Sequence, residues 1–168
     1  MIPDYCETDK PVNEAVRFVA DGMLGRLTKW LRILGFDTAY DPALDDHALL
    51  RLARAEGRIL LTCDRELAHR HGARSFLIES TDLLSQLREV INGLHLGLDA
   101  AFSRCPVCNT PLATLEREAV RDRVPPHVLE TNTEFRHCPH CNHVYWPGTH
   151  RARMLETLVR LGGQTSNG

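Results

Sequence analysis

The chain has 168 residues, of which 43% are hydrophobic and 25% charged, and its formal net charge is −2. This length and composition suit one globular domain with at most a small added module. A charge so near zero excludes a general electrostatic attraction to nucleic acids or membranes. We expect no membrane span and no signal peptide, and therefore a cytoplasmic location.

The first predicted elements follow a polar lead-in, residues 1–15. The apolar run over 17–20 predicts a short strand, and Asp21 comes directly after it. Leucines then recur at helical spacing until Gly35, which predicts a helix that ends at this glycine. Another face of this helix carries a basic row of Arg26, Lys29 and Arg32. The row is either a solvated surface or a contact for phosphate groups beside an acidic site.

Three further strands alternate with helices up to about residue 100. The strands are predicted over 36–41, 59–62 and 75–79. This alternation predicts βαβ units, and therefore a mostly parallel sheet with helices on both faces. In such sheets, functional groups collect at the carboxyl ends of the strands.

An aspartate follows each predicted strand. Asp21 follows the first strand, Asp45 and Asp46 the second, Asp64 the third and Asp82 the fourth. Parallel strands end at one edge, so we expect these carboxylates to gather there and to repel one another. Mg²⁺ or Mn²⁺ would relieve that repulsion, activate water and stabilise the leaving oxygen of a phosphodiester. For each acid except the first, the alternative is a helix N-cap.

The sequence lacks the motifs of other classes of α/β protein that carry acids at the sheet edge. A phosphoacceptor receiver domain needs a late lysine, but Lys10 and Lys29 are the only lysines. A haloacid-dehalogenase-type phosphatase needs a second aspartate where Met23 stands. No glycine-rich phosphate loop and no nucleophile elbow occur, and Cys63 is interpreted as a small buried residue.

Four of the six cysteines form two C-P-x-C knuckles separated by 29 residues: Cys105, Cys108, Cys138 and Cys141. Four thiolates predict a closed tetrahedral zinc site with a structural role. A redox dithiol is the alternative, and His137, His140 and His143 could substitute as ligands. A module this small needs the metal for much of its folding free energy.

The cysteine module also carries a candidate RNA surface. Tyr145 and Trp146 accompany several arginines, namely Arg104, Arg117, Arg121, Arg123, Arg136, Arg151 and Arg153. Basic and aromatic side chains together are typical of surfaces that bind single-stranded nucleic acid, although nearby acidic residues dilute the charge. Further nucleic-acid contact through this module is therefore one of two open interpretations, and a purely structural module is the other.

In chain order, the motifs resemble the Mut-seven C-terminal ribonuclease family over roughly residues 16–158. The resemblance rests on F-V-A-D-G-M-L-G-R-L-T-K-W-L-R from Phe18, L-G-F-D-T from Leu34, I-L-L-T-C-D from Ile59, both knuckles and Y-W-P-G-T-H from Tyr145. It implies a PIN-like nuclease domain over 16–100 and a zinc ribbon over 101–158, and the polar composition of residues 159–168 predicts a tail after them.

The resemblance also implies metal-dependent cleavage of RNA, as an endonuclease, with structural zinc and catalytic Mg²⁺ or Mn²⁺. By position, Asp21, Asp46 and Asp64 correspond to the acids that hold the catalytic ion, with Asp45 as a substitute for Asp46 and Asp82 as a fourth acid. Two alternatives stay open: an inactive RNA- or protein-binding module of the same fold, and a nuclease directed at DNA or at a particular nucleic-acid structure.

Overall fold

The computed structural model describes residues 16–162, so the predicted lead-in and residues 163–168 of the predicted tail lie outside the described residues. Its contacts divide the chain into two compact units, residues 1–106 and 107–168, and the division falls inside the first cysteine knuckle. Within 16–162, no helix is long and apolar enough to cross a membrane.

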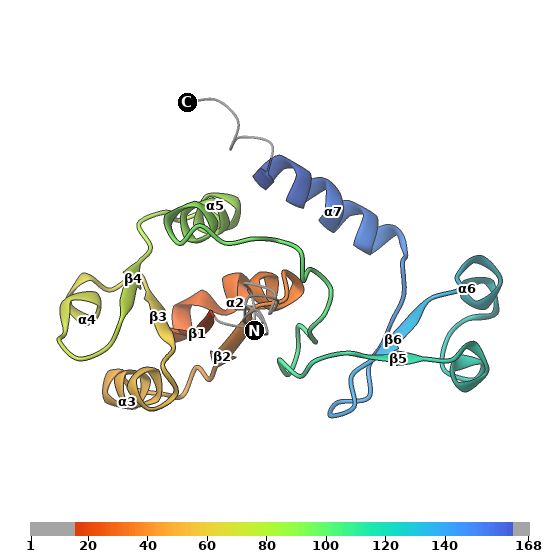
Figure 1. The fold of residues 1–168 in the computed structure, drawn as a ribbon, viewed down its shortest axis with the longest axis horizontal. Coiled ribbons are helices and arrows are strands. Elements are labelled where there is room, and N and C mark those ends of the chain that lie inside the picture. The colour runs from red at the N-terminus through yellow and green to blue at the C-terminus, as the bar shows by residue number, and fades with distance from the viewer. Residues whose placement is uncertain (1–15, 163–168) are drawn as a thin grey trace, which may run out of the picture. The chain divides into compact units, whose positions relative to one another are not determined.

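The first unit is built on a four-stranded parallel sheet with the order β2-β1-β3-β4 (Figure 1). The strands are β1 (Arg17–Ala20), β2 (Asp37–Tyr40), β3 (Ile59–Thr62) and β4 (Ser75–Leu77). The chain builds β2 on one side of β1 and then crosses back to place β3 on the other side. The carboxyl ends of β1 and β3 therefore flank the switch point, where open α/β sheets bind their ligands.

Helices cover both faces of this sheet, as the alternating pattern predicted. The helix α2 (Gly25–Ile33) contacts β2 and α5 (Leu83–Gly93), whereas α3 (Asp46–Glu56) contacts β1 and β3, and α4 (Arg65–His69) contacts β3 and β4. Right-handed crossovers that run in opposite directions from β1 place their helices on opposite faces. The core between these layers is aliphatic and aromatic, with side chains such as Phe18, Leu31 and Leu60 fully buried.

Glycine ends α2 where the sequence predicted it. Gly35 has a φ of 93°, a conformation that favours glycine, and a Cβ at this position would lie 2.2 Å from the carbonyl oxygen of Ala100. The backbone of the segment after α5 therefore packs directly against this turn. The amide of Phe102 also donates to the carbonyl of Ile33, 2.6 Å away.

The amino edge of the sheet is closed by a buried arginine. Arg58 is 9% exposed and donates to Asp37 Oδ1 at 2.7 Å and to the carbonyl of Phe18 at 3.0 Å. The starts of β1, β2 and β3 are thereby joined. The opposite, carboxyl edge is left for the acids described below.

The second unit contains a three-stranded antiparallel sheet, β5 (Ala113–Leu115), β6 (Phe135–His137) and β7 (Val144–Tyr145), in chain order. Its helices are η2 (Arg117–Val120), α6 (Pro126–Thr131) and α7 (Thr149–Gly162). The helix α7 thus continues through residues 159–162 of the predicted tail. The apolar core is small and centres on Val120, Val124, Val128 and Phe135, which is consistent with a module that needs a metal to fold.

Candidate active site and metal centre

The side chain of Asp21 is oriented toward β3. Its backbone amide donates to the carbonyl of Leu61 at 3.0 Å, so Asp21 continues the pairing of β1 with β3. Its carboxylate oxygen Oδ2 accepts a hydrogen bond from the hydroxyl of Thr62 at 2.8 Å, and its side chain does not cap the 3₁₀ helix η1 (Gly22–Leu24). Asp21 is therefore part of the sheet edge rather than a helix cap.

Thr62 joins the two acids that flank the switch point. It is fully buried at the end of β3, and its hydroxyl donates to Asp21 and accepts from the backbone amide of Asp64 at 3.0 Å. One buried side chain thus fixes the Asp21 carboxylate relative to the chain segment that carries Asp64. The sequence interpretation did not give Thr62 a role of its own. The T-x-D spacing of Thr62 and Asp64 was the only signal in the sequence that could have indicated one.

Asp64 is both a helix cap and a site residue. Its Oδ1 accepts from the amides of Glu66 at 2.7 Å and Leu67 at 3.1 Å and so begins α4. This confirms the cap that the sequence offered as an alternative. Its other oxygen, Oδ2, has no hydrogen-bond partner among the described residues. The cap therefore leaves one oxygen available to a cation.

Asp45 and Asp46 have different environments. Asp45 Oδ1 accepts from the amide of Ala48 at 2.8 Å, which makes Asp45 the N-cap of α3. Asp46 is the first residue of that helix, and its Oδ2 lies 3.1 Å from Nη1 of Arg70 in an ion pair. Asp46 is the better candidate for a ligand because its carboxylate is not used by the backbone, but Arg70 would have to release it.

Asp82 serves as the N-cap of α5. Its carboxylate accepts from the amide of Ser85 at 3.0 Å, and hydrogen bonds from Ser85 lower the pKa of this exposed carboxyl group. Within residues 16–162, the side chain of Asp82 makes no hydrogen bond that connects it to the other candidate acids. Its place as a fourth site residue stays a prediction.

The three principal acids do not converge closely in this structure. Among the described residues, only the four knuckle cysteines place three or more ligand atoms of His, Cys, Asp or Glu within 4.8 Å of one another. Asp21 and Asp64 are connected through Thr62, whereas Asp46 is held by Arg70. The carboxyl edge thus holds a fixed pair and a third acid that is engaged elsewhere.

Glu89 is a further acid near this edge that the sequence interpretation missed. It lies within α5, and its carboxylate accepts from the amides of Glu79 at 2.8 Å and Ser80 at 3.1 Å. Burial opposes ionisation of Glu89, but these hydrogen bonds outweigh it and lower its pKa. Burial, followed by the negative charges of Asp21 and Glu89, raises the pKa of the Cys63 thiol. The charge of Glu89 therefore acts on the same edge as Asp21.

The two knuckles bring their four thiols together. The sulfur atoms of Cys105, Cys108, Cys138 and Cys141 all lie within 4.8 Å of one another, and those of Cys108 and Cys138 are 3.3 Å apart. Cys105 and Cys138 are fully buried. Four thiols in such a cluster can bind a metal such as zinc, and this arrangement agrees with the predicted zinc ribbon.

The turns of the knuckles explain how the thiols converge. Asn109 and Asn142 follow the second cysteine of each knuckle and have φ values of 69° and 62°, a left-handed conformation that asparagine tolerates better than most residues. In the second knuckle, the amide of Cys141 donates to Cys138 Sγ at 3.4 Å. His143 Nδ1 lies 3.1 Å from Cys141 Sγ, so this histidine contacts a ligand atom rather than replacing it.

Parts of the predicted basic-aromatic surface have structural contacts. Trp146 packs against the valine-rich core of the second unit. Arg123 Nη2 donates to Asn142 Oδ1 at 2.8 Å and so supports the second knuckle. Nucleic-acid binding by this surface stays a prediction.

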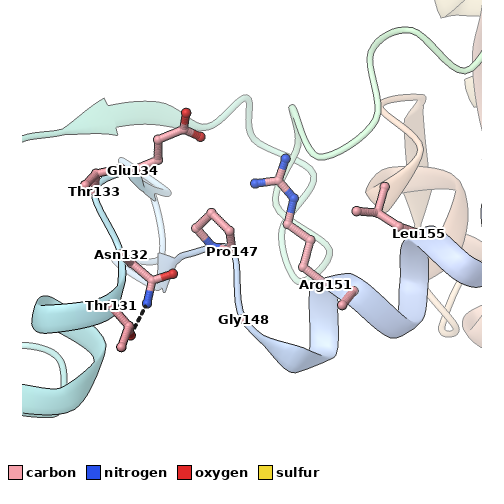
Figure 2. Close-up of a pocket in the computed structure, with 9 residues that line it drawn as sticks. Thr131, Asn132, Thr133, Glu134, Pro147, Gly148, Arg151 and Leu155 are labelled. Carbon is pink, nitrogen blue, oxygen red and sulfur yellow. Dashed lines mark hydrogen bonds between the residues drawn. The ribbon is translucent and has the colours of Figure 1, made fainter.

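A cavity of about 520 Å³ lies between the end of α6 and the start of α7 (Figure 2). Asn132 and Glu134 stand on one side of it, and Arg151 and Leu155 extend from α7 on the other. The amide of Asn132 is used for structure, because its Nδ2 donates to Val128 and Thr131. The lining combines one acid, one base, and neutral polar and apolar groups, and contains no cluster typical of catalysis.

One of three comparisons with known proteins found a match. No curated protein and no solved structure matches the chain. The family model described as Mut7-C RNAse domain matches residues 16–158, which include the parallel sheet, the switch-point acids and both knuckles. The chain therefore belongs to the Mut7-C RNAse domain family, which makes it a nuclease-like enzyme at the level of the family.

Proposed function

We propose that the chain is a metal-dependent ribonuclease that cuts RNA internally at the carboxyl edge of its parallel sheet. The observation that carries this proposal is the buried hydroxyl of Thr62, which connects Asp21 and Asp64 at the switch point. Membership of a ribonuclease family supports the substrate class. The internal cut, the catalytic ion and the acids that hold it are our inferences.

The residues at this edge fit a hard divalent cation. Asp21 and Asp64 each keep one carboxylate oxygen that has no hydrogen-bond partner among the described residues. Carboxylate oxygens are the ligands that Mg²⁺ and Mn²⁺ prefer. Asp46 would complete the set once Arg70 released it. When bound, such an ion supplies positive charge that activates water and stabilises the charge on the scissile phosphate.

The protein's own groups set the geometry and limit the chemistry. The hydroxyl of Thr62 holds Asp21 in one orientation, and the first amides of α4 hold Asp64. Both acids are thus positioned before substrate arrives, which reduces the cost of ordering them during the reaction. Cys63 does not supply a thiolate nucleophile, because its raised pKa keeps the thiol protonated at neutral pH.

The four knuckle cysteines would hold zinc in a structural role. A closed set of four thiolates leaves no position for substrate, so zinc would stabilise the second unit rather than take part in cleavage. Thiolates of this kind persist in a reducing compartment such as the cytoplasm.

The test compares two aspartates that cap helices in the same way. Asp64→Asn and Asp45→Asn both keep a good N-cap, because asparagine caps as well as aspartate. Of these two aspartates, only Asp64 is expected to hold the ion. A circular single-stranded RNA, which only an internal cut can open, is incubated with each protein and Mn²⁺, with EDTA as a control and circular DNA of the same sequence beside it.

We expect cleavage of RNA by the parent and by Asp45→Asn, loss of cleavage in EDTA, and loss in Asp64→Asn. Equal cleavage by all three proteins would refute the assignment and would indicate a contaminating ribonuclease. Cleavage of the DNA circle alone would redirect the proposal to a DNA nuclease.

The ion pair between Asp46 and Arg70 favours a second candidate, an RNA-binding module without cleavage. With Asp46 paired to Arg70, two of the three principal acids, Asp21 and Asp64, remain available for a cation. Arg70→Ala frees Asp46 and distinguishes the candidates: an active enzyme keeps or gains cleavage, whereas a binding module binds RNA and cuts it in neither form.

A further inference from the structure

Four side chains on one side of the α2 region form an exposed surface beside Asp21. We name Met23, Arg26, Lys29 and Trp30 the α2 stripe. Met23 is 84% exposed, Arg26 and Lys29 are exposed, and Trp30 is partly exposed. Met23 is separated from Asp21 by one residue, so the stripe starts at the candidate active site.

The predicted basic row curves around α2, because residues three apart in an α-helix are displaced by about 60° around its axis. Its last member, Arg32, has turned furthest from Arg26 toward the interior of the protein. Arg32 consequently lies inside the protein, 7% exposed, and donates to the carbonyls of Thr38 at 2.9 Å and Pro106 at 3.2 Å. Arg32 is therefore a structural residue, whereas Arg26 and Lys29 stay on the outer surface together with Trp30.

The two cations of the stripe differ from several other cations of the first unit. Arg58, Arg65 and Arg70 are paired with carboxylates. Arg26 and Lys29 make no hydrogen bond or ion pair with any residue of the described range. Their positive charges are therefore available to an anion from outside the chain, on the helix that follows Asp21.

Met23 is exposed on a backbone that is fixed. The amide of Leu24 donates to the carbonyl of Asp21 at 2.9 Å, and the hydroxyl of Tyr40 donates to the carbonyl of Gly22 at 2.8 Å. A Cβ on Gly25 would lie 2.7 Å from the same hydroxyl, so glycine is required for this contact. The fold thus holds a large apolar side chain in water at a defined place next to Asp21.

Two cations together with a partly exposed indole and an exposed thioether are the kinds of group that bind single-stranded nucleic acid. Its phosphates need positive charge, and its unstacked bases offer flat apolar faces to aromatic side chains. A duplex hides these faces, so the apolar members of the stripe favour a single strand.

We infer that the α2 stripe binds the single-stranded RNA that enters the active site, with Arg26 and Lys29 on its phosphates and Met23 and Trp30 against its bases. This inference rests on the proposed function and specifies how its substrate is held. It assigns binding rather than catalysis to all four side chains.

The test measures binding in the absence of cleavage. A fluorescent single-stranded RNA is titrated with the full-length protein in buffer without added Mg²⁺ or Mn²⁺, which leaves the structural zinc in place, and the dissociation constant is followed by anisotropy at several salt concentrations. The double variant Arg26→Gln/Lys29→Gln is compared with Arg51→Gln/Arg74→Gln. The second pair is exposed, likewise has no side-chain partner in the described range, lies outside the stripe, and changes the net charge equally.

Each phosphate contact on a single strand contributes about 0.7 to the slope of log affinity against log salt. Loss of two contacts should reduce that slope by about 1.4, which corresponds to about 25-fold weaker binding at 0.1 M salt. We expect this change for the stripe variant, with little change for the control. Met23→Ala should weaken binding without altering the slope, because it removes no charge.

Equal effects of the two double variants would overturn the inference, since they would show a general charge effect. Unchanged RNA binding by the stripe variant would also overturn the inference and would indicate that the stripe contacts a protein partner instead. Neither result bears on whether the parent cuts circular RNA, so failure of this inference is distinguishable from failure of the proposed function.

Discussion

Replacing Thr62 with valine tests the connection on which the candidate active site depends. Valine keeps the volume and the β-branched shape of threonine in a fully buried strand position. It removes one hydrogen bond to the Asp21 carboxylate and leaves the Asp64 amide without its acceptor. The substitution therefore changes polar contacts and little else.

The expected loss of stability follows from these two contacts. A hydrogen bond to a charged group contributes about 1.5–3 kcal/mol, and one between neutral groups about 0.5–1.5 kcal/mol. We expect Thr62→Val to lower the free energy of unfolding by about 2–4 kcal/mol. Thr28→Val is the matched control, because the Thr28 hydroxyl is buried without a hydrogen-bond partner in the described range. Removing that hydroxyl should be neutral or stabilising, within about 1 kcal/mol.

Native-state hydrogen exchange followed by mass spectrometry measures the effect within the first unit, because peptides from β1 and β3 can be assigned separately. A loss of 2–4 kcal/mol lowers protection in these peptides by about 30- to 700-fold. Metal-dependent cleavage should fall as well. Protection in Thr62→Val that equals that of the parent, or of Thr28→Val, would refute the idea that this hydroxyl holds the two acids together.

Three further outcomes are expected. Glu89→Gln should be less stable than the parent at neutral pH but not in acid. Because the folded-state pKa of Glu89 is lowered, its contribution to stability is complete above the ordinary glutamate pKa of about 4.3 and disappears as the pH falls through the folded value. Unfolding of both proteins at pH 7 and pH 3 measures this difference. Gly25→Ala should destabilise the parent by displacing the Tyr40 hydroxyl, and a double-mutant cycle should find a smaller cost in a Tyr40→Phe background. Elemental analysis should find one zinc per chain in the parent and in Cys63→Ser. Cys141→Ser should lose the zinc, together with the circular dichroism of the second unit. Zinc retained in both variants would contradict the four-thiol site.

The elements of the fold could be predicted because their signals are local. Strand runs, helical spacing and glycine stops lie within a few residues of one another, and each predicted strand of the first unit is present. The caps at Asp45, Asp64 and Asp82 were also foreseen as alternatives, since an N-cap contacts amides two or three residues away. Spacing within one segment therefore carried this information.

The parts that sequence analysis could not supply are contacts between distant segments. The bond from Thr62 to Asp21 spans 41 residues and depends on the register of β1 against β3. The burial of Arg32 depends on a carbonyl 74 residues away. The pairing of Asp46 with Arg70 links two helices. No single-segment pattern encodes these contacts, because each forms only after the sheet has been assembled.

The order of strands in the sheet has a consequence for the newly made chain. A chain leaves the ribosome from its N-terminus, so β1 can first pair with β2, and only later with β3, which is its other neighbour. Asp21 and Asp64 meet through Thr62 only after that second, non-local pairing, which is slow to form. Under the proposed chemistry, the candidate active site of the nascent protein is therefore incomplete until the third strand has been synthesised and docked.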